Sequence, residues 1–414
     1  MISAMSIRLT LLLASLLGLA SVSLQRPATV PWPPTVERLP SPALNGSAQP
    51  HLSVSDRGVM LSWVEKEGER ATLKYSERIP AGWSAPRVVA SGGDWFVNWA
   101  DVPSVMRLAD GTLAAHWLQK SGPDTYAYDV RLSYSTDDGK TWARSFTPHN
   151  DGTTTEHGFA SLFQVPGAGL GLVWLDGRAM KPDAGHGGHG AASGAMSLRF
   201  ATYGRDWKQS AEGPLDVRVC ECCPTSAAVT ADGPIAAFRN RSDEEVRDIH
   251  VTRFEHGKWT EPVAVHEDGW KITGCPVNGP MLSARGRDVA LAWFSGKDEK
   301  GRAFLSFSKD AGRTFGAPIR LDESATLGRV DVELLPDGAA VASWIESAGG
   351  RAQFVASRVS PSGAKSPPVT VSGLAGTRAS GYPRVAWHAD ELVFAWTESV
   401  DGRTSVQTAV ARTR

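Results

Sequence analysis

The sequence predicts an all-β fold, a β-propeller built from seven copies of a four-stranded blade. Three observations support this prediction: an apolar run ending in an aromatic residue recurs seven times, Asp-Gly turns precede several of these runs, and Gly (42) and Pro (26) are frequent. A sheet of this size cannot bury its own faces. Copies stacked around an axis bury them and leave only short, protected edges.

The seven copies share a hairpin whose second strand carries the aromatic residue, with a polar residue two positions later. The aromatic residues are Trp63, Trp117, Trp174, Phe238, Trp293, Trp344 and Trp396. The polar residues are Glu65, Gln119, Asp176, Asn240, Ser295, Glu346 and Glu398. Turns such as Asp110-Gly111 and Asp337-Gly338 are hairpin signals. The last copy lacks a fourth strand, so we expect a strand near Val36 to Leu39 to complete it and close the ring.

Two turns carry the same eight-residue motif, S-x-D-x-G-x-T-W, from Ser135 to Trp142 and, with Phe in the last place, from Ser308 to Phe315. Its Asp can accept hydrogen bonds from backbone N–H groups, its Gly tolerates positive φ, and its aromatic residue packs between sheets. With this motif, residues 51–414 resemble the Asp-box (BNR) repeat proteins of the sialidase superfamily. Six blades are usual in that family, so six is the alternative count.

The N-terminus resembles an export signal, because Arg8 precedes the apolar run Leu9 to Leu19 and small residues follow at Ser21 and Ser23. The run is short for a membrane span. We therefore expect a signal peptide at 1–23, an extended lead-in at 24–50 and the propeller at 51–414, in a periplasmic or secreted protein. An uncleaved N-terminal anchor is the alternative, and no other segment resembles a membrane span.

The charge balance bears on the partner, since 43 Lys and Arg face 44 Asp and Glu, for a net charge of −1. This gives no electrostatic basis for binding nucleic acid or an anionic membrane.

In a propeller, the loops between second and third strands and the connections between blades emerge on one face, here called the ring face. The longest connections of this chain reach that face and carry Trp, Asp and Arg, which suit a glycan. The predicted substrate-binding residues are Trp95, Trp99, Asp176, Arg178 and Trp270. For each of them, solvating a loop or filling the channel is the alternative.

The resemblance to sialidases implies three arginines that clamp a carboxylate, a Tyr nucleophile paired with a Glu, and an Asp acid. The segment from Asp101 to Leu113 aligns with the family's Arg-Ile-Pro hairpin, but Asp101 stands where the first arginine belongs. A carboxylate there would repel sialic acid, so we expect no conventional sialidase activity. The resemblance implies these catalytic candidates: Asp101, Asp124, Arg239, Arg241, Tyr382 and Arg384.

All four cysteines lie in two ring-face connections, at Cys220, Cys222, Cys223 and Cys275. An even count in an exported protein favours a disulfide between the two loops. The close spacing also permits a thiolate site for zinc or copper(I), to which His186 and His189 could add nitrogen ligands. A flexible Gly/His insertion is the alternative for those two histidines.

The sequence thus predicts an exported propeller that acts on or binds glycans at its ring face and requires no cofactor. A divergent glycoside hydrolase and a binding protein are both open. Two other functions remain: a non-enzymatic scaffold for a protein partner, and a metal-binding exported protein that uses the Cys and His loops.

Overall fold

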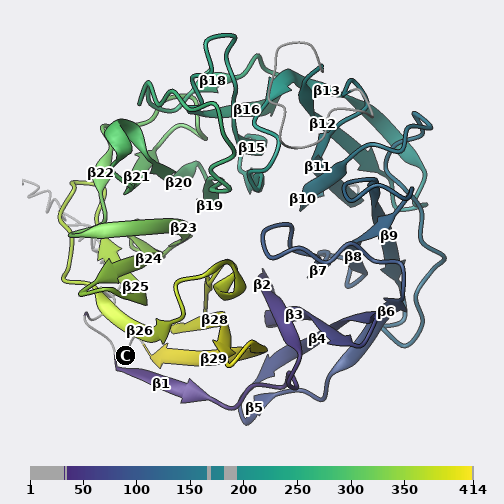
Figure 1. Cartoon of the computed structure of the whole chain (residues 1–414), viewed down its shortest axis with the longest axis horizontal. Coiled ribbons are helices and arrows are strands. Elements are labelled where there is room, and N and C mark those ends of the chain that lie inside the picture. The colour runs from purple at the N-terminus through teal and green to yellow at the C-terminus, as the bar shows by residue number, and fades with distance from the viewer. Residues whose placement is uncertain (1–31, 33–34, 166–168, 181–193, 413–414) are drawn as a thin grey trace, which may run out of the picture.

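The computed structural model describes residue 32 and residues 35–165, 169–180 and 194–412 (Figure 1). The predicted signal peptide at 1–23 lies outside the described residues. No helix of the described part is long and apolar enough to cross a membrane.

The chain forms a closed ring of seven β-sheets, which confirms the predicted propeller and its seven blades (Figure 1). The first blade contains β2 (Ser47–Ser55), β3 (Gly58–Glu67), β4 (Arg70–Ile79), β5 (Gly82–Trp83) and β6 (Arg87–Gly92). The second contains β7 (Ser104–Arg107), β8 (Leu113–Lys120) and β9 (Tyr128–Ser135). The third contains β10 (His157–Val165), β11 (Gly169–Asp176), β12 (Met196–Tyr203) and β13 (Gln209–Val219).

The fourth and fifth blades are β14 (Ser226–Thr230), β15 (Gly233–Arg239), β16 (Ile249–Glu255), β17 (Lys258–Trp259) and β18 (Val263–Ala264); and β19 (Met281–Arg285), β20 (Asp288–Ser295), β21 (Arg302–Ser308) and β22 (Ile319–Arg320). The last two are β23 (Ala325–Leu334), β24 (Ala340–Ala348), β25 (Arg351–Val359) and β26 (Val369–Leu374); and β27 (Arg384–His388), β28 (Glu391–Val400), β29 (Arg403–Arg412) and β1 (Val36–Leu39). Two short 3-10 helices, η1 (Lys297–Glu299) and η2 (Arg378–Ser380), lie in connections.

The ring closes as expected, because β1 from the lead-in pairs antiparallel with the C-terminal strand β29. Val36 lies opposite Ala411 and Leu39 opposite Thr408. The first and the last described strands in the sequence therefore share the seventh blade.

The repeat aromatic residues occupy equivalent places, since each lies in the second strand of its blade. Trp63, Trp174, Trp344 and Trp396 are fully buried, and the blades pack face to face around them. Between the sixth and seventh blades, for example, Phe354 contacts Phe394 at 5.9 Å and Trp396 at 6.1 Å between ring centroids. The core is thus a series of interfaces between blades.

The two turns that carry the predicted Asp-box motif make the hydrogen bonds expected of it. In the second blade, Asp137 accepts hydrogen bonds from the backbone N–H of Thr141 (2.9 Å) and from its hydroxyl (2.6 Å), while Ser135 accepts one from the backbone N–H of Gly139 (2.8 Å). The turn from Ser308 to Phe315 repeats these contacts at 2.9, 2.7 and 2.9 Å. The motif is therefore structural, as predicted.

Candidate functional site

The inner strands enclose a cavity of about 360 Å³ on the axis, with walls from all seven blades. Two of the predicted catalytic residues, Asp101 and Arg384, line it together. Its other polar walls are His51, Ser53, Ser104, Ser161, Gln164, Thr225, Ser226, Asp331 and Glu333. Val54, also in the wall, is 46% exposed, so the cavity is in contact with solvent near the end of β2.

Three carboxyl groups of this cavity have raised pKa values. Burial raises the pKa of Asp101 to about 7. Hydrogen bonds donated by the Phe159 N–H (2.8 Å) and the Tyr128 hydroxyl (3.1 Å) act in the opposite direction and lower this pKa. Burial and the nearby charge of Asp331 raise the pKa of Glu333 to about 8. Burial also raises the pKa of Asp331, although Arg384 and two backbone N–H groups oppose the shift.

Several polar atoms in the cavity walls have no hydrogen-bond partner among the described residues. They are Oδ1 of Asp101, Nε of Arg384 and Nδ1 of His51, all in buried positions. Arg384 directs Nη1 to the sulfur of Met281, at 3.2 Å, so its guanidinium is held in the wall. A polar ligand would supply the partners that these atoms lack.

Tyr382 and Trp99 lie beside the cavity but are occupied by packing. Their rings stack at 6.0 Å between centroids, and the guanidinium of Arg329 lies 4.6 Å above the Trp99 ring. The Tyr382 hydroxyl donates to the carbonyl of Val277 at 2.6 Å. Neither side chain is a free platform for a sugar.

The two predicted arginines of the fourth blade are also engaged. Arg239 donates to the carbonyls of Asn278, Arg247 and Phe294 and stacks over Trp270 at 4.9 Å. Arg241 pairs with Glu221 and Glu245. The sequence predicted that one of these guanidiniums binds a substrate carboxylate. In the structure, each guanidinium instead binds groups of the protein itself.

Two further candidates lie away from the cavity. Trp95 stacks on Trp117 at 5.5 Å between centroids. Asp124 is exposed in a turn, where its carbonyl accepts a hydrogen bond from the N–H of Ala127. The structure does not bring either residue to Asp101.

The predicted cysteine loops lie side by side. The thiols of Cys222, Cys223 and Cys275 all interact with the Cys220 sulfur, and all four cysteines are free thiols. Arg247, which sequence reasoning missed, places Nη1 3.2 Å from the Cys220 sulfur. His186 and His189 lie outside the described residues.

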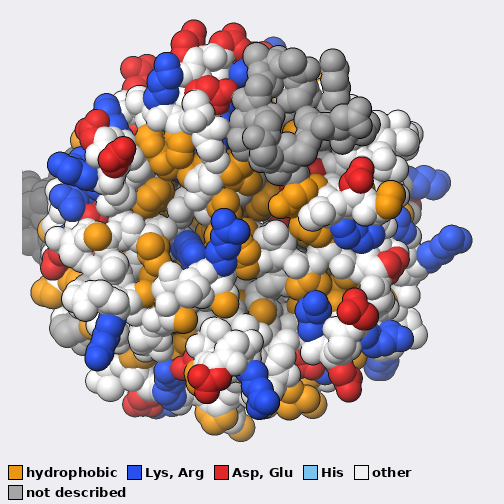
Figure 2. Space-filling view, viewed as in Figure 1, with side chains coloured by type: hydrophobic (Ala, Val, Ile, Leu, Met, Phe, Trp, Pro, Cys, Tyr) orange, Lys and Arg blue, Asp and Glu red, His pale blue; other side chains and the backbone are white. Residues whose placement is uncertain are grey.

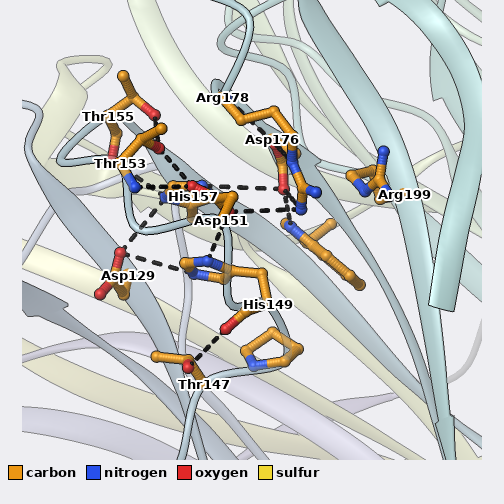
Figure 3. Close-up of polar contacts among 12 residues, drawn as sticks. Asp129, Thr147, His149, Asp151, Thr153, Thr155, His157, Asp176, Arg178 and Arg199 are labelled. Carbon is orange, nitrogen blue, oxygen red and sulfur yellow. Dashed lines mark hydrogen bonds and ion pairs between the residues drawn. The ribbon is translucent and has the colours of Figure 1, made fainter.

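A second polar cluster, in which sequence reasoning named only Asp176 and Arg178, joins the second and third blades (Figure 3). The rings of His149 and His157 stack at 3.7 Å with 10° between their planes, and Asp129, Asp151 and Asp176 surround them. A metal ion lies near the plane of each imidazole that binds it. The two parallel rings do not both direct a lone pair at one ion, but Asp151, His157 and Asp176 place one ring nitrogen and two carboxylate oxygens within 4.8 Å of one another, so the cluster could hold a proton or a metal ion.

Asp176 and Arg178, both predicted to bind substrate, belong to this cluster. Arg178 donates from Nε and Nη2 to the Asp176 carboxylate, each at 2.7 Å. The same carboxylate accepts the indole N–H of Trp174 at 2.9 Å. Asp176 is fully buried and therefore supports the fold here rather than facing solvent.

One face of the disc shows how charge is distributed over the surface (Figure 2). Acidic and basic side chains are interspersed around the rim, and basic side chains lie near the centre. No single sign of charge covers this face, as the balanced composition predicts.

Comparisons with known proteins place the fold but not a family. No family model matches the chain, and no curated protein matches it. Solved structures do match the chain. A protein of unknown function from Dyadobacter fermentans is 14% identical, with a TM-score of 0.50, and the match covers 92% of this chain and 97% of the Dyadobacter chain. The polysaccharide lyase Uly1 is 12% identical with a TM-score of 0.51, covering 89% of this chain and 90% of its own.

A Trypanosoma rangeli sialidase in complex with the inhibitor DANA is 11% identical with a TM-score of 0.47, covering 80% of this chain and 57% of the sialidase chain. The solved neighbours named here therefore include a sialidase, a polysaccharide lyase and a protein of unknown function. At these identities the likeness concerns the fold alone.

Proposed function

We propose that the protein is exported and binds or acts on a glycan, with the axial cavity as the site. The observation that supports this best is the meeting of Asp101, Glu333 and Arg384 in one cavity of about 360 Å³. Small-molecule pockets are typically about 300–1,000 Å³, which includes this volume.

The polar groups of the cavity suit sugar hydroxyls. With pKa values of about 7 and about 8, Asp101 and Glu333 each carry a proton for much of the time at neutral pH. A protonated carboxyl can donate to a hydroxyl or to a glycosidic oxygen, whereas a carboxylate accepts. Arg384 adds a fixed donor. The same pair of carboxyls could serve binding or general acid–base chemistry.

The charge of the cavity selects against acidic sugars. A ligand carboxylate would compete with the three carboxyl groups of Asp101, Asp331 and Glu333 for the one guanidinium in the described lining, that of Arg384. We therefore propose a neutral saccharide as the ligand. The solved neighbour described as a polysaccharide lyase indicates that this fold can carry carbohydrate chemistry.

The proposal is tested by screening the purified protein on an array of neutral and sialylated glycans, then titrating the best ligand calorimetrically. Asp101→Asn keeps the shape of the side chain and its acceptor oxygen for Phe159 and Tyr128 but removes the acid. We expect it to weaken binding at least tenfold, and Asp124→Asn, in the exposed turn, to leave binding unchanged.

Equal affinity of the Asp101→Asn protein and the wild type, or binding only to acidic glycans, would overturn the proposal. Export is tested separately by fractionating cells and sequencing the N-terminus of the mature protein.

A further inference from the structure

The four cysteines form a compact thiol cluster that the glycan proposal does not use. The sulfur atoms of Cys220, Cys222 and Cys223 all lie within 4.8 Å of one another, and those of Cys220 and Cys223 are 3.4 Å apart. Cys275, from the next connection between blades, interacts with both Cys220 and Cys222. Cys220 and Cys223 are almost completely buried, at 1% and 2% exposed.

Rigid contacts hold the two loops in place. The backbone N–H of Cys220 bonds to the carbonyl of Arg239 at 2.9 Å, which fixes the start of the first loop against β15. Gly279, close to Cys275 in the second loop, lies so near the first that a Cβ there would come within 1.9 Å of the Pro224 carbonyl. The thiols are therefore presented by two loops that pack directly on each other.

Among the described residues, the carboxylates nearest the cluster are engaged by arginines, which leaves the cysteine sulfurs as the candidate metal ligands. Glu221, between the cysteines in sequence, directs one carboxylate oxygen to Arg241 and the other to Arg247, the latter at 3.0 Å. Glu245 pairs with the same two guanidiniums. Both carboxylates are thus paired with arginines, and Nη1 of Arg247 contacts both Glu221 and the Cys220 sulfur.

We propose that Cys220, Cys222 and Cys223, with Cys275 as a fourth ligand, bind one thiophilic d¹⁰ metal ion, Zn²⁺ or Cu⁺. Thiolates bound to one tetrahedral zinc at about 2.3 Å are separated by about 3.8 Å. The observed sulfur separations of 3.4 Å and of up to 4.8 Å lie on either side of that distance, so small rotations of the side chains suffice. Soft sulfur donors select such ions over Mg²⁺ or Ca²⁺, which require oxygen.

A disulfide is the competing chemistry, because export would place these thiols in an oxidising compartment. A disulfide bond is about 2.05 Å long. The shortest sulfur separation given by the structure, 3.4 Å, is that of two unbonded thiols. Three thiols gathered around one point favour an ion over a single bridge, which would use only two of them.

The test uses the full-length protein, reduced, freed of metal with a chelator and titrated anaerobically with Zn²⁺ or with Cu⁺. We expect one ion per chain, and a competition assay with each metal alone tells which is held more tightly. Co²⁺ in place of Zn²⁺ should give the visible and near-ultraviolet bands of tetrahedral thiolate coordination.

Cys223→Ser should weaken binding at least a hundredfold and abolish the thiolate bands, while Ser362→Ala, in an exposed turn of the sixth blade, should change neither. Should Cys223→Ser fail to fold, alkylation of the wild-type protein decides: bound metal should protect the thiols, and chelation should expose them. No binding above the metal-free background, or a disulfide joining the two loops that persists in protein purified from the periplasm, would overturn the proposal. Each outcome is independent of glycan binding.

Discussion

In the sixth blade, the carboxylate of Glu346 accepts a hydrogen bond from the indole N–H of Trp344 at 2.7 Å. The same geometry joins Trp63 to Glu65 and Trp174 to Asp176, at 2.8 and 2.9 Å. The repeat aromatic residue and the polar residue two positions later are therefore one structural unit in three of the blades. In these blades the polar residue of the repeat therefore stabilises a buried tryptophan.

Glu346→Ala should lower the free energy of unfolding by about 2 kcal/mol, because the buried Trp344 N–H loses its acceptor. The Glu346 carboxylate also accepts from the N–H groups of Glu323 and Ser324, which lose their acceptor as well. Urea unfolding monitored by fluorescence measures the difference. Glu398→Ala is the matched control in the seventh blade, because the Trp396 indole N–H has no hydrogen bond to Glu398. A loss of stability in Glu398→Ala as large as that in Glu346→Ala would contradict the structural role of the Trp344–Glu346 hydrogen bond.

Gly139→Ala tests the packing of the first Asp-box. Gly139 has a φ of 78°, and a Cβ there would come within 1.9 Å of the Tyr75 hydroxyl of the neighbouring blade. Gly257→Ala is the control, with a φ of 82° and open space around the added Cβ. Left-handed backbone costs both variants about 1–2 kcal/mol. Overpacking should cost Gly139→Ala about 1–3 kcal/mol more in the free energy of unfolding. Equal losses of unfolding free energy in the two variants would show that the Tyr75 side chain moves aside without destabilising the fold.

The histidine pair should make stability depend on pH. Burial alone would lower the pKa of His157, but the surrounding carboxylates of Asp129, Asp176 and Asp151 outweigh it and raise this pKa. Burial and the neighbouring imidazole lower the pKa of His149, so a proton taken up by the pair favours His157.

A histidine whose pKa is raised in the folded state contributes its full stabilisation at pH values below its ordinary pKa of about 6.5. This stabilisation is lost as the pH rises through the raised pKa. His157→Gln should therefore cost more stability at about pH 6 than at about pH 9. Unfolding free energies across this range measure it, with His266→Gln, at a half-exposed position, as the control. An identical loss at both ends would show that His157 is not protonated in the fold.

We expect no turnover of a fluorogenic sialoside. Arg239 and Arg241 are saturated by carbonyls and carboxylates within the protein, and the position of the first clamp arginine holds Asp101. The cavity therefore lacks the three guanidiniums that a sialic acid carboxylate requires. Turnover that Asp124→Ala abolishes would contradict this prediction and restore a conventional sialidase site.

The repeat made most of the fold predictable, because seven spaced aromatic residues and two Asp-boxes report local structure directly. The pairing of β1 with β29 was predictable from the missing strand of the last copy. The cavity acids were harder to find. Asp331 and Glu333 stand two positions apart in an inner strand, a spacing that puts both on one face, but only the closed ring shows that this face is the axis.

The buried partners of the candidate residues could not be predicted. Arg247, His149 and His157 have no motif of their own, and their roles arise from contacts between loops far apart in sequence. Contacts between distant segments also explain why Arg239 and Arg241 were wrongly expected to be free for a substrate. Carbonyls and carboxylates of other segments already bind both guanidiniums.

The assignment of the axial cavity as the glycan site is tested by a crystal structure of the protein with the neutral glycan that binds most tightly in the array. We expect sugar density in the axial cavity, with a hydroxyl within hydrogen-bond distance of Oδ1 of Asp101 and of the Arg384 guanidinium. A glycan bound only at the rim of the ring face, with the axial cavity holding solvent alone, would contradict it.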